Sequence, residues 1–114
     1  MAKGHKRRPR RRSAAEVKLK HYREQHARRR ALQRYDVYLD HHAYLELCQK
    51  INGGVTDPSK VVLLHQQSNT RTAYAIYHQD IWLGAIYHKG TNQIVTFIPP
   101  ENLEALIDEL IATT

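Results

Sequence analysis

Cysteine and long apolar segments are both scarce in this chain of 114 residues. Its single cysteine, Cys48, excludes an internal disulfide and a cluster of thiolate metal ligands. No apolar run approaches the ~18 residues that a membrane-spanning helix needs. The arginine-rich beginning is not followed by an apolar segment, as it would be in a secretory signal. We therefore expect a cytoplasmic protein with no membrane partner.

Acidic residues are nearly absent from the first third of the chain. Residues 1–34 contain fourteen Lys and Arg and two Glu, which gives a local net charge of +12. Residues 35–114 contain four Lys and Arg and nine Asp and Glu, which gives −5. A one-sided block of this density favours a polyanionic partner, and nucleic acid is the first candidate. The alternative is a solubilising tail without a specific partner.

The positive block divides into an arm and a helix. Residues 3–12 hold seven cations and no side chain that could enter a core, so we expect residues 1–12 to form a disordered arginine-rich arm. Residues 13–114 are expected to form a basic helix joined to a small α+β domain. Contacts with phosphate are predicted for cations of both parts: Lys6, Arg7, Arg8, Arg10, Arg11, Arg12, Lys18, Lys20, Arg23, Arg28, Arg29, Arg30 and Arg34. Such contacts give salt-dependent affinity with little sequence information.

Two helices are predicted before any strand. Ser13 and Glu16 form a capping box, so the first helix should begin at about residue 14 and continue to about Arg34. Its apolar residues form a poor stripe, which indicates a mostly solvated helix whose last turns alone pack. The second helix has Asp40 as its N-cap, shows an i, i+3, i+4, i+7 apolar pattern and ends at Gly53-Gly54.

Four short strands and a final helix should follow. The expected strands are Val61–Gln66, Thr72–His78, Ile81–His88 and Ile94–Ile98. Short polar loops at Gln79-Asp80 and at residues 89–92 favour tight hairpins, and Pro99-Pro100 ends the last strand. After Pro100, an apolar stripe typical of a packed helix contains Leu103, Leu106, Ile107, Leu110 and Ile111. The predicted fold class is α+β, with two N-terminal helices, a four-stranded antiparallel meander and a C-terminal helix.

Several polar residues are candidates for chemistry. The chain has eight histidines, but their spacing suits no metal site and no HExxH motif occurs, so we expect neither a metal nor a cofactor. Histidine titrates near neutral pH and can act as general acid or base. Arg71 begins a strand, where its guanidinium could bind a phosphate in bidentate fashion or pair with an acidic neighbour. Tyrosines could stack on unpaired bases or fill the core; the candidates are Tyr35, Tyr74, Tyr77 and Tyr87.

Residues from about His26 to Pro100 resemble the RelE and colicin-type RNases, the barnase–EndoU–colicin–RelE fold. The resemblance rests on four segments: Arg34-Tyr35-Asp36, Ile51-Asn52-Gly53-Gly54, Gln67-Ser68-Asn69-Thr70-Arg71-Thr72 and Ile94-Val95-Thr96-Phe97-Ile98-Pro99-Pro100. Where relatives carry Val-Val-Tyr-Asp, this chain has Ala85-Ile86-Tyr87-His88. The last of the four segments is the most specific.

The resemblance implies an RNase-like domain and metal-independent RNA cleavage. Such enzymes activate a ribose 2′-OH against the adjacent phosphate, which requires a base, an acid and positive charge. The candidate catalytic residues of this chain are His26, Arg71, Tyr87, His88 and Thr96.

Three functions stay open at the level of sequence. The first is an RNA-binding protein that acts as a toxin-type endoribonuclease. The second is a non-enzymatic nucleic-acid binder, such as a phage regulator or a protein of the ribosome or another ribonucleoprotein. The third is a protein-interaction module whose acidic C-terminal helix docks an antitoxin or a second copy.

Overall fold

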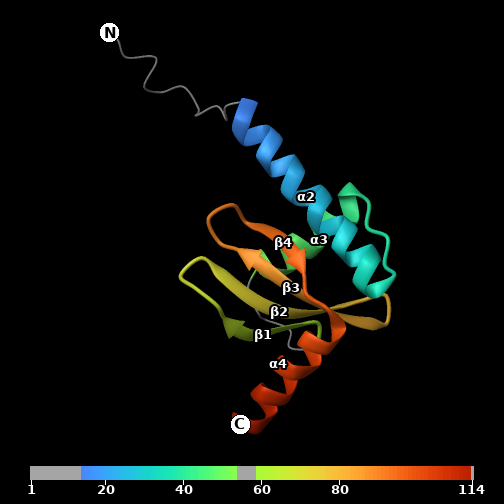
Figure 1. The fold of residues 1–114 in the computed structure, drawn as a ribbon, viewed down its shortest axis with the longest axis vertical. Coiled ribbons are helices and arrows are strands. Elements are labelled where there is room, and N and C mark those ends of the chain that lie inside the picture. The colour runs from blue at the N-terminus through green and yellow to red at the C-terminus, as the bar shows by residue number, and fades with distance from the viewer. Residues whose placement is uncertain (1–13, 54–58, 114) are drawn as a thin grey trace.

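A computed structural model describes residues 14–53 and 59–113 of the chain. Its elements are α2 (Ala14–Tyr35), α3 (His41–Asn52), β1 (Val61–Gln66), β2 (Arg71–His78), β3 (Ile81–His88), β4 (Gln93–Phe97) and α4 (Pro100–Thr113). Within the described residues the order confirms the predicted α+β class, with two helices, a meander and a last helix (Figure 1). The predicted arm (residues 1–12), the cap at Ser13 and Gly54 lie outside the described residues.

The four strands form one antiparallel sheet in the order β1-β2-β3-β4. The β2–β3 hairpin turns at Gln79 and Asp80, whose φ angles are 50° and 69°. Two successive left-handed residues match the twist of the flanking strands, which is why a two-residue loop can join them. Asn92, at the end of the second hairpin loop, also has a positive φ of 54°. Both predicted hairpins are confirmed.

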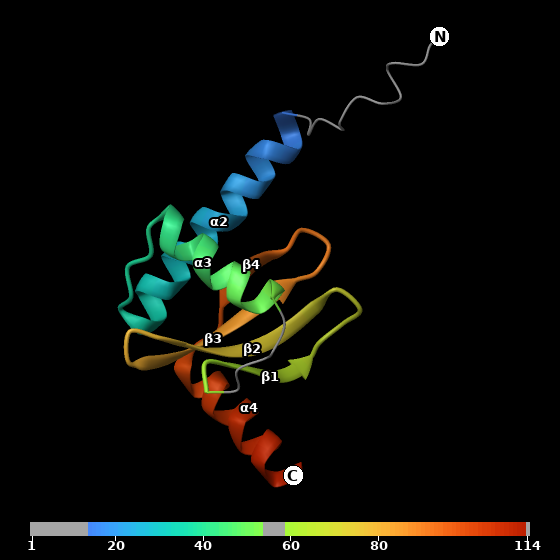
Figure 2. The ribbon, with the colours of Figure 1, turned by 180° about the vertical axis from the view of Figure 1, so that it is seen from behind.

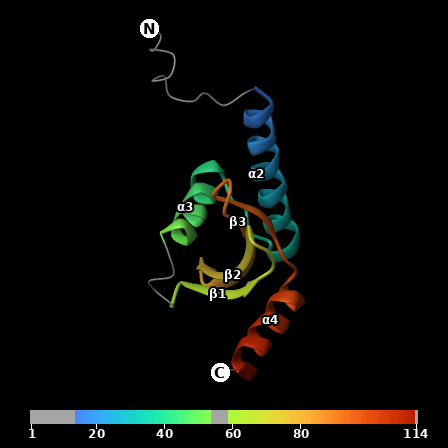
Figure 3. The ribbon, with the colours of Figure 1, turned by 90° about the vertical axis from the view of Figure 1, so that its left-hand side faces the viewer.

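The two faces of the sheet pack against different helices. One face carries Ile76, Leu83 and Phe97, which form a core with α2 and α3. Figure 2 shows α3 crossing in front of the sheet on this side. The other face carries a smaller cluster that includes Ala73 and Leu103 of α4. Figure 3 shows α2 and α3 as two separate helices, with the sheet between and below them.

Helix α2 packs along β4 through small side chains. Ala27 and Ala31 have no exposed surface, and their size lets the helix approach the strand closely. The first turns of α2 pack little, since Val17 and Leu19 are largely exposed. This confirms the expectation that only the last turns pack.

Hydrogen bonds from side chains fix α2 to the end of β4. The Tyr35 hydroxyl donates to the carbonyl of Ile98 at 2.6 Å and accepts from the N–H of Gly84 at 3.1 Å. The guanidinium of Arg34 donates to the carbonyl of Phe97 at 2.8 Å. These bonds satisfy backbone groups at the sheet edge and set the position of α2 relative to β4.

Helix α4 is less buried than its sequence suggests. Only Leu103 is buried, Leu106 and Ile107 are half-buried, and Ile111 is 66% exposed. Leu106, Ile107 and Leu110 pack partly against the same cluster as Leu103, so the predicted stripe is packed except at Ile111 near the end of the helix.

Gly84 lies on β3, facing the beginning of α4. Replacing it with alanine should lower the free energy of unfolding by about 1–3 kcal/mol. A Cβ atom at Gly84 would lie 2.6 Å from Cγ1 of Ile98 and 3.2 Å from Cβ of Leu103. Urea unfolding of Gly84→Ala measures the cost. Gly53→Ala is the matched control, because Gly53 has a helical φ of −74° and a Cβ there would meet only two carbonyl oxygens, at 3.3 and 4.0 Å. Equal stability of the two variants would contradict the close packing at Gly84.

Candidate nucleic-acid interface

A stripe of basic side chains flanks the buried stripe of α2. Arg23, His26 and Arg30 each precede by one residue a buried member of the helix, namely Glu24, Ala27 and Ala31. One residue corresponds to about 100° around a helix of 3.6 residues per turn. The basic stripe is therefore held beside the core without entering it.

This stripe forms one wall of a cleft of about 400 Å³. We call it the basic cleft, and its lining consists of Tyr22, Arg23, His26, Arg30, Arg34, Arg71, Val95 and Thr96. The lining contains four arginines and no carboxylate. The cleft thus brings together three of the five predicted catalytic residues, His26 from α2, Arg71 from β2 and Thr96 from β4.

Arg71 stands on a rigid backbone. Its N–H donates to Oγ of Ser68 at 3.1 Å, and its carbonyl accepts from the N–H groups of Gln67 and Ser68. The side chain is exposed. Across residues 14–53 and 59–113, no carboxylate forms an ion pair with it, which disfavours the alternative of an acidic partner. Its charge is free to meet an anionic ligand.

The other cleft arginines also keep their charge uncompensated. Arg30 donates to the amide oxygen of Gln33 at 2.7 Å, and Arg34 donates to the carbonyl of Phe97. Both acceptors are neutral. A cluster of guanidinium groups without carboxylates is suited to a ligand with several negative oxygens, such as a phosphodiester.

His26 is half-buried in this positive surrounding. Burial lowers the pKa of His26 below its ordinary value of 6.5, and the charges of Arg30, Arg29 and Arg34 lower it further. The ring is therefore neutral at neutral pH and can accept a proton. This is the state that a general base needs.

Tyr87 and His88 do not line the cleft, although both were predicted to take part. The Tyr87 hydroxyl donates toward Asn52 and Asn92, on the side of the sheet that α3 covers. Burial raises the pKa of Tyr87 to about 12, so the hydroxyl stays protonated. The structure therefore does not bring Tyr87 together with His26, and the catalytic role of Tyr87 stays a prediction.

His88 lies near the basic cleft but is not part of its lining. It pairs with Arg71 across β2 and β3, so the two side chains share a face of the sheet. Its Nδ1 accepts the N–H of Thr91 at 3.2 Å. His88 thus lies beside the basic cleft without lining it.

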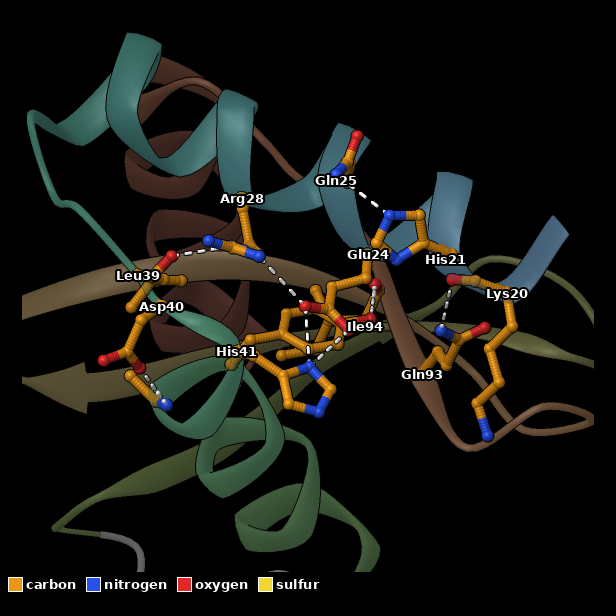
Figure 4. A network of polar contacts seen from close by, with 12 residues as sticks. Lys20, His21, Glu24, Gln25, Arg28, Leu39, Asp40, His41, Gln93 and Ile94 are labelled. Carbon is orange, nitrogen blue, oxygen red and sulfur yellow. Dashed lines mark hydrogen bonds and ion pairs between the residues drawn. The ribbon is translucent and has the colours of Figure 1, made fainter. Parts of the chain in front are cut away.

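Arg28 lies on the opposite flank of α2 and has internal partners. Its guanidinium contacts a carboxylate oxygen of Glu24 at 3.1 Å and donates to the carbonyl of Leu39 at 2.7 Å. His41 approaches the same buried carboxylate at 2.8 Å, and Figure 4 shows both side chains pointing toward Glu24. The network holds α2 to the start of α3, and it gives Arg28 a structural role beside the predicted phosphate contact, which stays a prediction.

The other cations that were predicted to contact phosphate lie in different places. Lys18 and Arg29 are exposed on α2, and Lys20 lines other hollows beside Gln93 and Asn92. The arm residues from Lys6 to Arg12 lie outside the described residues. Within α2, the structure therefore gathers Arg23, Arg30 and Arg34 at the cleft.

The tyrosines predicted to stack on bases are engaged in the fold. Tyr35 bonds to Ile98, Tyr74 meets Tyr87 edge-on at 6.2 Å, and Tyr77 packs on Trp82 at 5.3 Å. Sequence reasoning missed Tyr22, which is 66% exposed at the basic cleft. Its position next to Arg23 and four residues before His26 was the available signal.

Cys48 and the histidines show no sign of metal chemistry. Cys48 is buried and its sulfur accepts the N–H of Ile94 at 3.4 Å, while burial raises the pKa of its thiol. Among the residues that the structure describes, no group of three or more His, Cys, Asp or Glu is arranged to hold a metal ion. None of the described helices is both long and apolar enough to cross a bilayer.

Comparison with known proteins gives no relative from which to transfer a function. No family model, curated protein or solved structure matches this chain.

Proposed function

We propose that this chain is a cytoplasmic RNA-binding protein with an RNase-like domain, and that the basic cleft is where it holds the phosphate backbone. The proposal is supported by one observation above all: four arginines without a carboxylate surround a single neutral histidine. Guanidinium groups bind phosphate oxygens in bidentate fashion, and contacts of this kind account for most nucleic-acid affinity.

The distribution of charge supports a polyanion over other ligands. Helix α4 carries Glu101, Glu104, Asp108 and Glu109 and no basic residue. It lies at the end of the molecule opposite to the N-terminal start of α2 (Figure 1). A polyanion would be attracted to the α2 end and repelled from the α4 end, which orients the encounter.

The cleft also offers the groups for metal-independent cleavage of RNA. In this proposal, neutral His26 takes the proton of a ribose 2′-OH, and the 2′-oxygen forms a bond to the adjacent phosphorus. The bond from phosphorus to the 5′-oxygen breaks, and that oxygen receives a proton from a water molecule, whose hydroxide takes back the proton held by His26. The products are a 2′,3′-cyclic phosphate and a 5′-hydroxyl. Arg71 and its neighbours stabilise the negative charge of the phosphorane.

Binding without cleavage is the second candidate. It is favoured by the lining of the cleft, where His26 is the one residue that titrates near neutral pH. A binder would serve on the ribosome, in another ribonucleoprotein or as a phage regulator. Incubation of total RNA with the purified chain in EDTA separates the two candidates, because only the enzyme generates cyclic phosphate ends.

A protein partner is the third candidate, and α4 is the observation that favours it. The half-buried Leu106, Ile107 and Leu110 and the exposed Ile111 form an apolar stripe on an acidic helix. An antitoxin or a second copy could cover it. Light scattering of the purified chain tests self-association, which Ile111→Asp should abolish if the stripe is the contact.

Arg71→Ala tests the cleft directly. The variant should bind RNA about 10–100-fold more weakly, because a hydrogen-bonded contact to a charged group contributes about 1.5–3 kcal/mol. The slope of log affinity against log salt should fall by about 0.7–0.9, as expected for one lost phosphate contact. Fluorescence anisotropy over a range of salt concentrations measures both.

Two further variants of the chain serve as controls for this measurement. Lys50→Ala removes one exposed positive charge from α3, outside the basic cleft, and should change affinity little. A chain without residues 1–12 should lose affinity through the arm while remaining sensitive to Arg71→Ala. Wild-type affinity and slope in Arg71→Ala would refute the proposed interface.

A further inference from the structure

The basic cleft has an aromatic edge that phosphate binding alone does not require. Tyr22 lines the cleft beside Arg23, and two thirds of its surface is exposed. In the described part of the chain, Tyr38 is the other tyrosine with this degree of exposure, and it lies outside the cleft. An exposed aromatic ring between cations is a common feature of surfaces that bind unpaired bases.

The ring of Tyr22 is held in place by its neighbour. It stacks on the ring of His26, with centroids 6.5 Å apart and an angle of 22° between the planes. The two residues are four apart on α2, which places them on one face of the helix. Because the two rings are nearly parallel and His26 is half-buried, Tyr22 presents one flat face in the lining of the cleft.

The size of the cleft limits what can reach this surface. A volume of about 400 Å³ is that of a site for a small ligand. It can take one backbone phosphate with its sugar, but a duplex would remain outside. Duplex bases are also stacked on each other, so only an unpaired base can present its face to Tyr22.

We propose that the basic cleft recognises single-stranded RNA, with a phosphate held by Arg30, Arg34 and Arg71 and the neighbouring base stacked on Tyr22. The inference rests on the proposed function of the cleft and adds to it the strandedness of the substrate and the residue that selects it. Stacking needs only the face of a base, so the recognition tolerates different sequences.

The test compares ligands with the same phosphates and different bases. Full-length chain is titrated by fluorescence anisotropy against a short single-stranded RNA, an abasic strand of equal length and a duplex of that RNA. The salt concentration is set high enough to weaken the contacts of the arm. Tyr22→Ala should weaken binding of the single-stranded RNA by about 5–100-fold, the range observed for the loss of one stacked base.

The other ligands and variants isolate the stacking. Tyr22→Ala should leave affinity for the abasic strand and the duplex unchanged, and Tyr22→Phe should keep near wild-type affinity for the single strand. Tyr38→Ala is the matched control and should bind every ligand as the wild type does. Because Tyr22 is exposed, none of these changes should affect folding.

The outcomes distinguish this inference from the proposed function. If Arg71→Ala weakens binding while Tyr22→Ala and the abasic strand do not, the cleft binds phosphate and the stacking is refuted. Equal losses in Tyr22→Ala and Tyr38→Ala also refute it. If neither Arg71→Ala nor Tyr22→Ala weakens binding, the cleft itself is not the interface and both proposals are overturned.

Discussion

Replacing His26 with glutamine should slow RNA cleavage by about 10²–10⁴-fold, the usual contribution of a positioned general base. Glutamine keeps the polarity and the approximate size of the side chain but cannot accept a proton. Affinity for the abasic strand should change little, because neutral His26 contributes no charge to phosphate binding. The rate is measured in EDTA as the appearance of 2′,3′-cyclic phosphate ends.

The dependence of this rate on pH identifies the base. Burial and three arginines lower the pKa of His26, so the ring becomes protonated only below pH 6.5. The cleavage rate should therefore be constant at alkaline pH, where His26 is neutral. It should fall as acidification protonates the ring of His26. In His26→Gln this acidic limb should disappear from the residual rate.

Controls separate the base from a general loss of structure. His42 is exposed on α3, and His42→Gln should cleave RNA as the wild type does. Circular dichroism verifies the fold of each variant. Full activity in His26→Gln would remove His26 from the mechanism. A wild-type chain that binds RNA but never cleaves it would eliminate the enzymatic proposal and leave the binding one.

Local signals were sufficient to predict the order of the elements. Asp40 accepts the N–H of Ala43 at 2.7 Å, as the N-cap pattern indicated. β1 and β3 have their predicted bounds, β2 begins one residue earlier at Arg71, and β4 is shifted by one residue to Gln93–Phe97. Caps, turns and periodicity depend on near neighbours in the chain, so a single sequence contains them.

What covers each element could not be predicted in the same way. The apolar stripe of α4 predicts a helix with one buried face, but periodicity does not say how far the neighbouring sheet extends. The cluster on the sheet buries Leu103 and covers Leu106, Ile107 and Leu110 in part, while Ile111 stays exposed. Similarly, nothing local to α2 indicates that it packs along β4.

The candidate site depends on that long-range packing. His26, Arg71 and Thr96 meet because α2 lies beside β4 and because two hairpins place β2 near β4. Tyr87 and His88 are adjacent on β3, and neither lines the cleft. Adjacent residues of a strand point to opposite faces of the sheet, but a single sequence does not say which face a helix will cover.

The largest expected loss of stability comes from Phe97, whose replacement by alanine should cost about 3–5 kcal/mol. Its ring has no exposed surface and belongs to the core between the sheet and α2 and α3. Truncation leaves a cavity that the neighbouring strand β3 can fill only partly. For a small domain this is a large share of the total free energy of unfolding.

Val95→Ala is the matched control from the same strand. Val95 is half-buried in the lining of the basic cleft, so its truncation removes fewer contacts and should cost less than about 1.5 kcal/mol. Urea unfolding measures both free energies. Because Arg34 donates to the carbonyl of Phe97, the packing of this residue also sets the distance between α2 and β4. If Phe97→Ala cost no more than Val95→Ala, β4 would not be packed against α2, and the cleft between them would lose its structural basis.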